Sequence, residues 1–138
     1  MSLHRHNPAE LAPPAGFSHA VTANGSRLVF LSGQTALDSG SGVVIGATPA
    51  EQFAAALGNL LTALRHAGGG PADLARVTVY TTDIAAYDAD ADELRDIWRR
   101  MAGRDYPAMT VVEVVRLREE RAVVELDGFA VLEEPGGA

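Results

Sequence analysis

Two acidic residues near the end of the chain, Glu125 and Asp127, alternate with apolar residues over positions 122–132. Side chains of a β-strand point to opposite faces in turn, so both carboxylates would share one face of a strand. The other face would be buried, because it carries Val124, Leu126, Ala130 and Leu132. A carboxylate on a partly apolar face can have a raised pKa and act as a general acid or base. A solvated surface or a pair with an arginine also explains the pattern, and the pattern alone slightly favours that interpretation.

Three further residues are candidates for a site. Glu113 alternates in the same way on the preceding strand, where it shares a face with Met109. Gly33 follows a strand expected over residues 27–32, and a glycine there often marks the close approach of a ligand or of another backbone. Its free N–H could hold an anion. Ser32 has no G-x-S-x-G sequence around it, so a serine hydrolase is not expected.

Metal and thiol chemistry have little support in the sequence. The chain has no cysteine, which excludes disulfides, thiolate nucleophiles and cysteine-ligated metals. Asp88, Asp90 and Asp92 alternate as in a calcium-binding loop, but that loop needs Gly where Glu93 stands and Glu where Arg99 stands. An acidic helix N-terminus explains these aspartates better. We therefore expect no metal and no cofactor.

Two amphipathic helices are expected to support the strands. Thr48-Pro49-Ala50-Glu51 combines a capping box with proline at the first helical position, and Gly68 would end this helix. A second helix is expected over about residues 90–102, with Gly103 as its stop signal. Each helix has one apolar stripe at helical spacing: Phe53, Leu57, Leu60, Leu61 and Leu64 in the first, and Leu94, Ile97, Trp98 and Met101 in the second.

The expected strands cover residues 17–21, 27–32, 75–82, 109–117 and 122–132. Asn24-Gly25 predicts a tight turn that joins the first two into a hairpin. The order β-β-α-β-α-β-β predicts an α+β fold with the helices on one face of a mixed sheet. At 138 residues the chain has room for one domain over 1–138, with an extended arm over 1–14 and a flexible tail over 133–138. The other face of the sheet needs a cover, and subunit association is the natural one.

Charge and composition exclude several classes of partner. The formal net charge is −7, the chain has no lysine, and aromatic residues make up 6%. Nucleic-acid binding needs clustered cations and stacking rings, so it is not expected, and neither is binding to an anionic membrane. No apolar run approaches the ~20 residues that span a bilayer, and the N-terminus does not read as a signal peptide. We expect a cytoplasmic protein.

Several short motifs, taken in order, resemble the RidA/YjgF family, the reactive-intermediate (enamine/imine) deaminases. The resemblance extends over nearly the whole chain. The matching stretches are Leu31-Ser-Gly-Gln34, Glu51-Gln52 with Leu57-x-Asn59-Leu60, residues 73–84, Tyr106-Pro-Ala108, residues 112–117 and residues 124–131.

The resemblance implies a chorismate-mutase-like fold, in agreement with the element order, and a homotrimer with small-molecule pockets at the subunit clefts. Members of the family hydrolyse 2-aminoacrylate and related enamine or imine acids to 2-keto acids and ammonia, with neither metal nor cofactor.

The resemblance also implies roles for particular residues. The glutamate that holds the attacking water falls on Glu125, which the residue pattern had already singled out. The pocket glycine falls on Gly33, with Ser32 beside it. Phe17 replaces a tyrosine, so it keeps the ring and loses the hydroxyl. The place of a pocket asparagine maps to Asp92.

Met109 stands where the family has the arginine that holds the substrate carboxylate. An arginine forms a bidentate, charge-assisted pair with a carboxylate, whereas a methionine offers a soft apolar surface. We therefore expect a hydrolase with altered specificity, acting on an enamine, imine or similar metabolite that is neutral or cationic. The alternative is a non-catalytic trimer of the same fold that binds a small ligand. An endoribonuclease fits the acidic charge least well.

Overall fold

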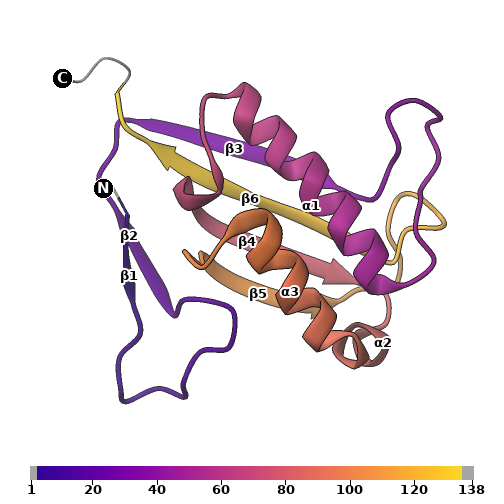
Figure 1. The fold of residues 1–138 in the computed structure, drawn as a ribbon, viewed down its shortest axis with the longest axis horizontal. Helices are drawn as coiled ribbons and strands as arrows, with labels where there is room; N and C mark the ends of the chain where they lie inside the picture. Colours follow the sequence, from indigo (N-terminus) through magenta and orange to yellow (C-terminus); the bar gives the residue numbers. More distant parts are fainter. Residues whose placement is uncertain (1–2, 135–138) are drawn as a thin grey trace.

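The computed structural model describes residues 3–134 and is built around one four-stranded sheet. The strand order is β3-β6-β4-β5, and the strands are β3 (Arg27–Gln34), β6 (Val124–Leu132), β4 (Leu74–Thr81) and β5 (Ala108–Glu113). Helices α1 (Pro49–His66) and α3 (Ala91–Ala102) lie side by side on one face of this sheet (Figure 1). The short helices η1 (Pro71–Asp73) and α2 (Ile84–Ala89) lie in the connections before β4 and before α3.

The sheet is mixed, which confirms the predicted α+β class. Strand β6 runs antiparallel to both β3 and β4, while β4 and β5 are parallel. Parallel neighbours need a crossover, and helices α2 and α3 supply it between β4 and β5. The crossover places α3 over β5, and a pocket lies between these two elements.

Helix α1 begins and ends as the sequence predicts. The Thr48 hydroxyl accepts a hydrogen bond from the backbone N–H of Glu51 at 3.1 Å, and the Glu51 carboxylate accepts one from the N–H of Ala47 at 2.7 Å. Gly68 follows the helix with φ +95°, a conformation that glycine adopts without strain. The capping and stop residues therefore fix both ends of the helix.

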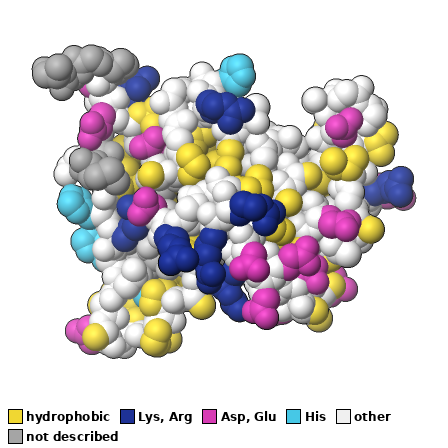
Figure 2. Space-filling view, in the orientation of Figure 1, with side chains coloured by type: hydrophobic (Ala, Val, Ile, Leu, Met, Phe, Trp, Pro, Cys, Tyr) yellow, Lys and Arg dark blue, Asp and Glu magenta, His cyan; other side chains and the backbone are white. Residues whose placement is uncertain are grey.

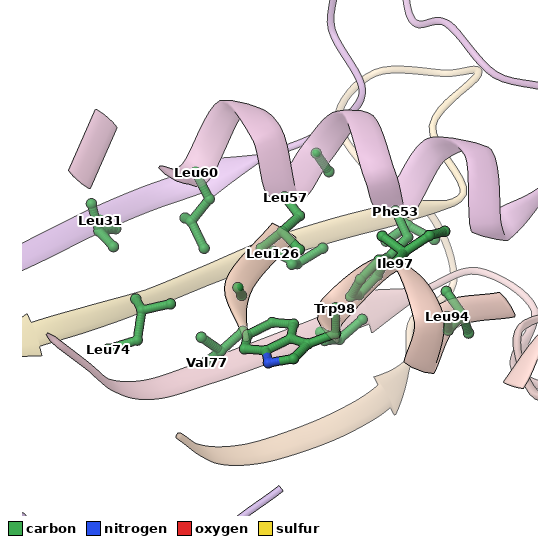
Figure 3. Close-up of a cluster of buried hydrophobic side chains, with 14 of the residues drawn as sticks. Leu31, Phe53, Leu57, Leu60, Leu74, Val77, Leu94, Ile97, Trp98 and Leu126 are labelled. Carbon is green, nitrogen blue, oxygen red and sulfur yellow. The ribbon is translucent and has the colours of Figure 1, made fainter. Parts of the chain in front are cut away.

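The core lies between the helices and the sheet. Figure 3 shows apolar side chains from α1, α3, β3, β4 and β6 directed toward one another. The residues of both predicted helical stripes take part, as do Val124, Leu126 and Ala130, the predicted buried side of the last strand. The packing of both helices against the sheet buries one of its faces, which is why both helices lie on that face.

Two predictions about strands are wrong. The segment before Asn24-Gly25 does not form a hairpin with β3, because β2 (Ala20–Ala23) pairs with β1 (Leu3–His6) in a separate two-stranded sheet. Leu3 is buried against Ala75 and Val131, so the N-terminal arm has an apolar contact with the sheet. The Asn24-Gly25 turn motif carries no information about this distant contact.

The second correction concerns β5. The strand ends at Glu113 rather than at residue 117, and the Val115 side chain is 98% exposed. Glu113 accepts a hydrogen bond from the N–H of Ile84 at 2.9 Å, so it joins the end of β5 to the start of α2, and the chain then leaves the sheet.

The face of the sheet away from the helices is largely open. It carries exposed Leu28, Phe30 and Phe129, and the Phe30 side chain is 75% exposed. The β1–β2 sheet covers only the end near Val131. No helix in the described part of the chain is long and apolar enough to cross a membrane. The predicted tail over 133–138 lies mostly outside the described residues.

Candidate functional site

Acidic side chains gather on the open face, where β6 lies between β3 and β4. In the sheet register, Glu125 is opposite Tyr80 and Asp127 is opposite Thr78. The Tyr80 hydroxyl donates a hydrogen bond to Asp127 at 3.2 Å. Within residues 3–134 no arginine forms an ion pair with Glu125 or Asp127, so their negative charges are not neutralised by a salt bridge.

Gly33 brings strand β3 against the Glu125 carboxylate. The pairing of β3 with β6 shifts between Leu31 and Gln34, so Gly33 lies in an irregular part of the strand. A Cβ atom at Gly33 would lie 3.0 Å from the carboxyl carbon of Glu125 and closer still to one of its oxygens. The absence of a side chain therefore makes room for the carboxylate. Ser32 is exposed beside this contact.

The surroundings of Glu125 favour its protonated form. Partial burial raises the pKa of the Glu125 carboxyl above its ordinary value, and the negative charges of Glu119 and Asp127 raise it further. Burial also raises the pKa of Tyr80, with Asp127 contributing again, so the tyrosine remains a hydrogen-bond donor. A carboxyl group with a raised pKa beside an open surface can exchange protons with a bound water or substrate.

Phe17 and Met109 meet on the other side of the sheet. Met109 packs against the core on the helix face of β5. Ser18 fixes its neighbour Phe17 at the start of β5, because its N–H donates to the Pro107 carbonyl at 2.9 Å and its hydroxyl donates to the Tyr106 carbonyl at 2.7 Å. These bonds hold a distant part of the chain against the Tyr106-Pro-Ala-Met109 motif.

The space between α3, β5 and residues 15–17 is a pocket of about 310 Å³. Its walls are mostly aromatic and apolar, and they include Phe17, Phe53, Tyr87, Trp98, Tyr106 and Met109. Arg95 also lines it, a residue that the sequence analysis did not select. The available signal was its position on α3, next to Leu94 and three residues before Trp98, at the border of the buried stripe.

The structure does not bring all predicted site residues together. Asp92 lies on the solvent side of α3, where its 96% exposed side chain pairs with Arg95, and it does not line the pocket. Glu125 and Gly33 are in contact, and Phe17 and Met109 share a pocket, but the two pairs lie on opposite faces of the sheet. Within one chain, a ligand in the pocket cannot reach Glu125 without crossing the sheet.

Charged side chains on the helix face are segregated along α3. Figure 2 shows arginines gathered toward the end of α3 and acidic side chains over α2 and the start of α3. This is the favourable arrangement for the helix dipole, with Asp92 and Glu93 in the first turn and Arg99 and Arg100 in the last. The described residues contain no group of three or more His, Cys, Asp or Glu side chains that could hold a metal ion.

The mixed sheet with two helices on one face defines an α+β protein. Sequence comparison then identifies the family, because residues 7–132 match the profile described as Endoribonuclease L-PSP. The chain belongs to this family, which is the RidA/YjgF family.

Relatives and a solved structure agree with the assignment. The chain is 29% identical to RutC family protein UK114 of Drosophila melanogaster over 86% of this chain and 81% of that protein. It is 28% identical to a 2-iminobutanoate/2-iminopropanoate deaminase of Bos taurus over 90% of this chain and 83% of that one. A Rid family protein of unknown function from Yersinia pestis, YyfB, has a similar structure, with a TM-score of 0.85, 29% identity, and coverage of 96% of this chain and all of that one.

Proposed function

We propose that this protein is a hydrolase of enamines or imines in which Glu125 activates the attacking water. The observation that carries the proposal is the Glu125 carboxylate beside Gly33, partly buried, near Glu119 and Asp127, and with a raised pKa. Such a carboxyl group accepts a proton from water more readily than an ordinary surface glutamate does. The bovine relative, named as a deaminase of two imino acids, supports this reaction class.

The proposed assembly is a homotrimer with the small-molecule site at the subunit boundaries. Exposed Leu28, Phe30 and Phe129 form an apolar strip on the open face, and association would remove this strip from water. An interfacial site also explains how residues on opposite faces of the sheet could act on one ligand. Glu125 and Gly33 would come from one subunit, and Phe17 and Met109 from its neighbour.

The specificity should differ from that of a deaminase with an arginine at position 109. Met109 cannot form a bidentate pair with a carboxylate, so the substrate would present an uncharged or cationic group to this residue. Losing such a contact costs on the order of several kcal/mol in transition-state binding. Small imino acids such as 2-iminobutanoate should therefore be poor substrates. The endoribonuclease alternative remains weaker, because the acidic open face would repel phosphates.

The test is a turnover assay on imines that an amino-acid oxidase generates in place. The purified protein should accelerate hydrolysis of at least one bulky or neutral imine and have little effect on 2-iminobutanoate. Glu125→Gln should abolish that turnover, because an amide does not accept the proton, while Glu113→Gln on β5 should retain it. Full activity of Glu125→Gln would overturn the assignment. Binding without turnover of any imine would favour the non-catalytic alternative.

A further inference from the structure

The pocket under α3 has its own polar groups, and they differ in kind from those around Glu125. Its volume of about 310 Å³ lies at the lower end of the ~300–1,000 Å³ usual for small-molecule sites. Rings from four parts of the chain line it, namely Phe17 before β2, Phe53 on α1, Tyr87 and Trp98 on the crossover helices, and Tyr106 before β5. The Trp98 and Tyr106 rings are stacked, with centroids 6.4 Å apart. Flat apolar walls of this kind suit a planar ring.

Arg95 gives the pocket a positive charge. It is the one charged residue among the described residues of the lining, which include no carboxylate. Its side chain is 41% exposed and forms an ion pair with Asp92, whose side chain is 96% exposed. Exposed pairs of this type contribute little stability. A ligand carboxylate could therefore take the place of Asp92 at little cost to the protein.

The other polar groups of the lining are compatible with an anion. The indole Nε1–H of Trp98 is buried and has no acceptor within the described part of the chain. Figure 3 shows this nitrogen on the edge of the ring that points away from α1. An indole nitrogen only donates, so it can be satisfied only by an acceptor. Burial raises the pKa of Tyr87 to about 12, which keeps this hydroxyl neutral and adds no negative charge to the pocket.

We infer that this pocket binds a small monocarboxylic acid with an aromatic ring. The ring lies among Phe17, Trp98 and Met109, and the carboxylate pairs with Arg95 at the mouth. Met109 then contacts the uncharged part of the ligand, so a carboxylate is recognised by α3 instead of by β5. The inference deepens the proposed function, because an imine that carries such a ring and carboxylate would be its substrate, but binding itself does not require Glu125.

The single tryptophan of the chain makes the test direct, because Trp98 is in the pocket wall. Its fluorescence, excited at a wavelength that a phenyl group does not absorb, is followed during titration with 3-phenylpropanoate. The neutral analogue is 3-phenylpropanamide, and butanoate supplies the charge without the ring. We expect a saturable change with the aromatic acid, at least about tenfold tighter than with either comparison compound.

Two variants on helix α3 distinguish a specific contact between Arg95 and the ligand carboxylate from a general effect of removing one positive charge. Arg95→Gln should weaken 3-phenylpropanoate about tenfold and leave 3-phenylpropanamide unchanged. Arg99→Gln is the matched control, because Arg99 also pairs with an acidic residue three positions earlier and has a side chain 45% exposed. It should bind like the parent. Circular dichroism checks the fold, and Arg95→Lys, which retains the charge, should restore part of the affinity if Arg95→Gln is poorly folded.

Equal affinity for the acid and the amide, or parental affinity in Arg95→Gln, would overturn the inference. Glu125→Gln distinguishes it from the proposed function, since this variant should bind 3-phenylpropanoate normally while losing turnover. Acid binding at Arg95 with no hydrolysis of any imine would support the pocket and contradict the enzyme. Hydrolysis of an imine without binding of 3-phenylpropanoate would support the enzyme and contradict the pocket.

Discussion

The two faces of the sheet differ in which parts of the chain supply their functional side chains. On the open face, Glu125, Asp127 and Tyr80 come from adjacent strands, and their spacing follows directly from strand alternation and register. On the helix face, the pocket combines an N-terminal segment, helices α1, α2 and α3, and β5, and α3 contributes the most lining residues. The open face carries the carboxylates of Glu125 and Asp127, which have no arginine partner within the described residues, while Arg95 is the one charged residue among the described lining of the aromatic pocket. Groups that differ this much are suited to different parts of one ligand, or to different ligands.

Replacing one phenylalanine on each face gives the largest contrast. Phe53 is buried and packs against the rings of Tyr87 and Trp98, so Phe53→Ala should lower the free energy of unfolding by about 3–5 kcal/mol. Phe30 is exposed on the open face and contacts Phe129 at a centroid distance of 6.1 Å. Its replacement by alanine should weaken self-association instead. Urea denaturation at several protein concentrations, with light scattering, measures both effects.

The concentration dependence decides this comparison. The cost of Phe53→Ala should be nearly constant across concentrations, whereas the cost of Phe30→Ala should depend on the fraction of assembled protein. A monomer mass near 14.5 kDa for the parent protein would contradict the trimer and the interfacial site. A large, concentration-independent cost of Phe30→Ala would show that the open face is covered within one chain.

A methyl group at Gly33 should disturb the open face alone. The Cβ of Gly33→Ala would occupy the space of the Glu125 carboxylate, which is the flexible end of a side chain and can move. We expect a small change in stability and a loss of hydrolytic activity of about tenfold or more, because the base is displaced from its position. The change is measured as kcat/KM on the best imine and as Tm.

Gly40→Ala is the control for Gly33→Ala. Its Cβ would lie 3.5 Å from the nearest atom, an oxygen of Asp38, which is an ordinary contact. This variant should retain full activity. Ligand-induced changes in Trp98 fluorescence should be the same in both variants. Altered fluorescence in Gly33→Ala would show that the two faces are coupled within the chain.

The same contrast explains what the sequence could predict. Alternation along residues 122–132 placed Glu125 and Asp127 on one face and a buried row on the other, and capping residues placed both ends of α1. These signals are local, because each depends on neighbours within a few positions. The family resemblance had to supply the link between Glu125 and Gly33, which are far apart in the sequence.

Contacts between distant segments could not be predicted from the sequence. The Asn24-Gly25 turn predicted a hairpin, but the burial of Leu3 against Val131 gave β2 a different partner. The pocket position of Phe17 depends on Ser18 bonding to the backbone of residues 106 and 107. Arg95 became visible as a pocket residue only when the crossover placed α3 above β5. None of these contacts leaves a periodic signal in the chain.

The smallest predicted effect concerns pH. The raised pKa of Glu125 means that, between its unfolded and folded pKa values, the folded protein binds more protons than the unfolded chain. This carboxyl group therefore lowers the stability as pH rises from its ordinary value near 4.5 through the raised folded value. Glu125→Gln removes the charged form, so we expect a small rise in Tm at pH 7 that disappears by pH 4. Thermal denaturation across this pH range measures the difference in Tm between Glu125→Gln and the parent protein. The control is Glu120→Gln, in the exposed turn before β6, which also removes one negative charge from a chain of net charge −7. An equal rise in both variants would assign the effect to net charge, and a lower Tm for Glu125→Gln at pH 7 would mean that the ionised carboxylate stabilises the open face.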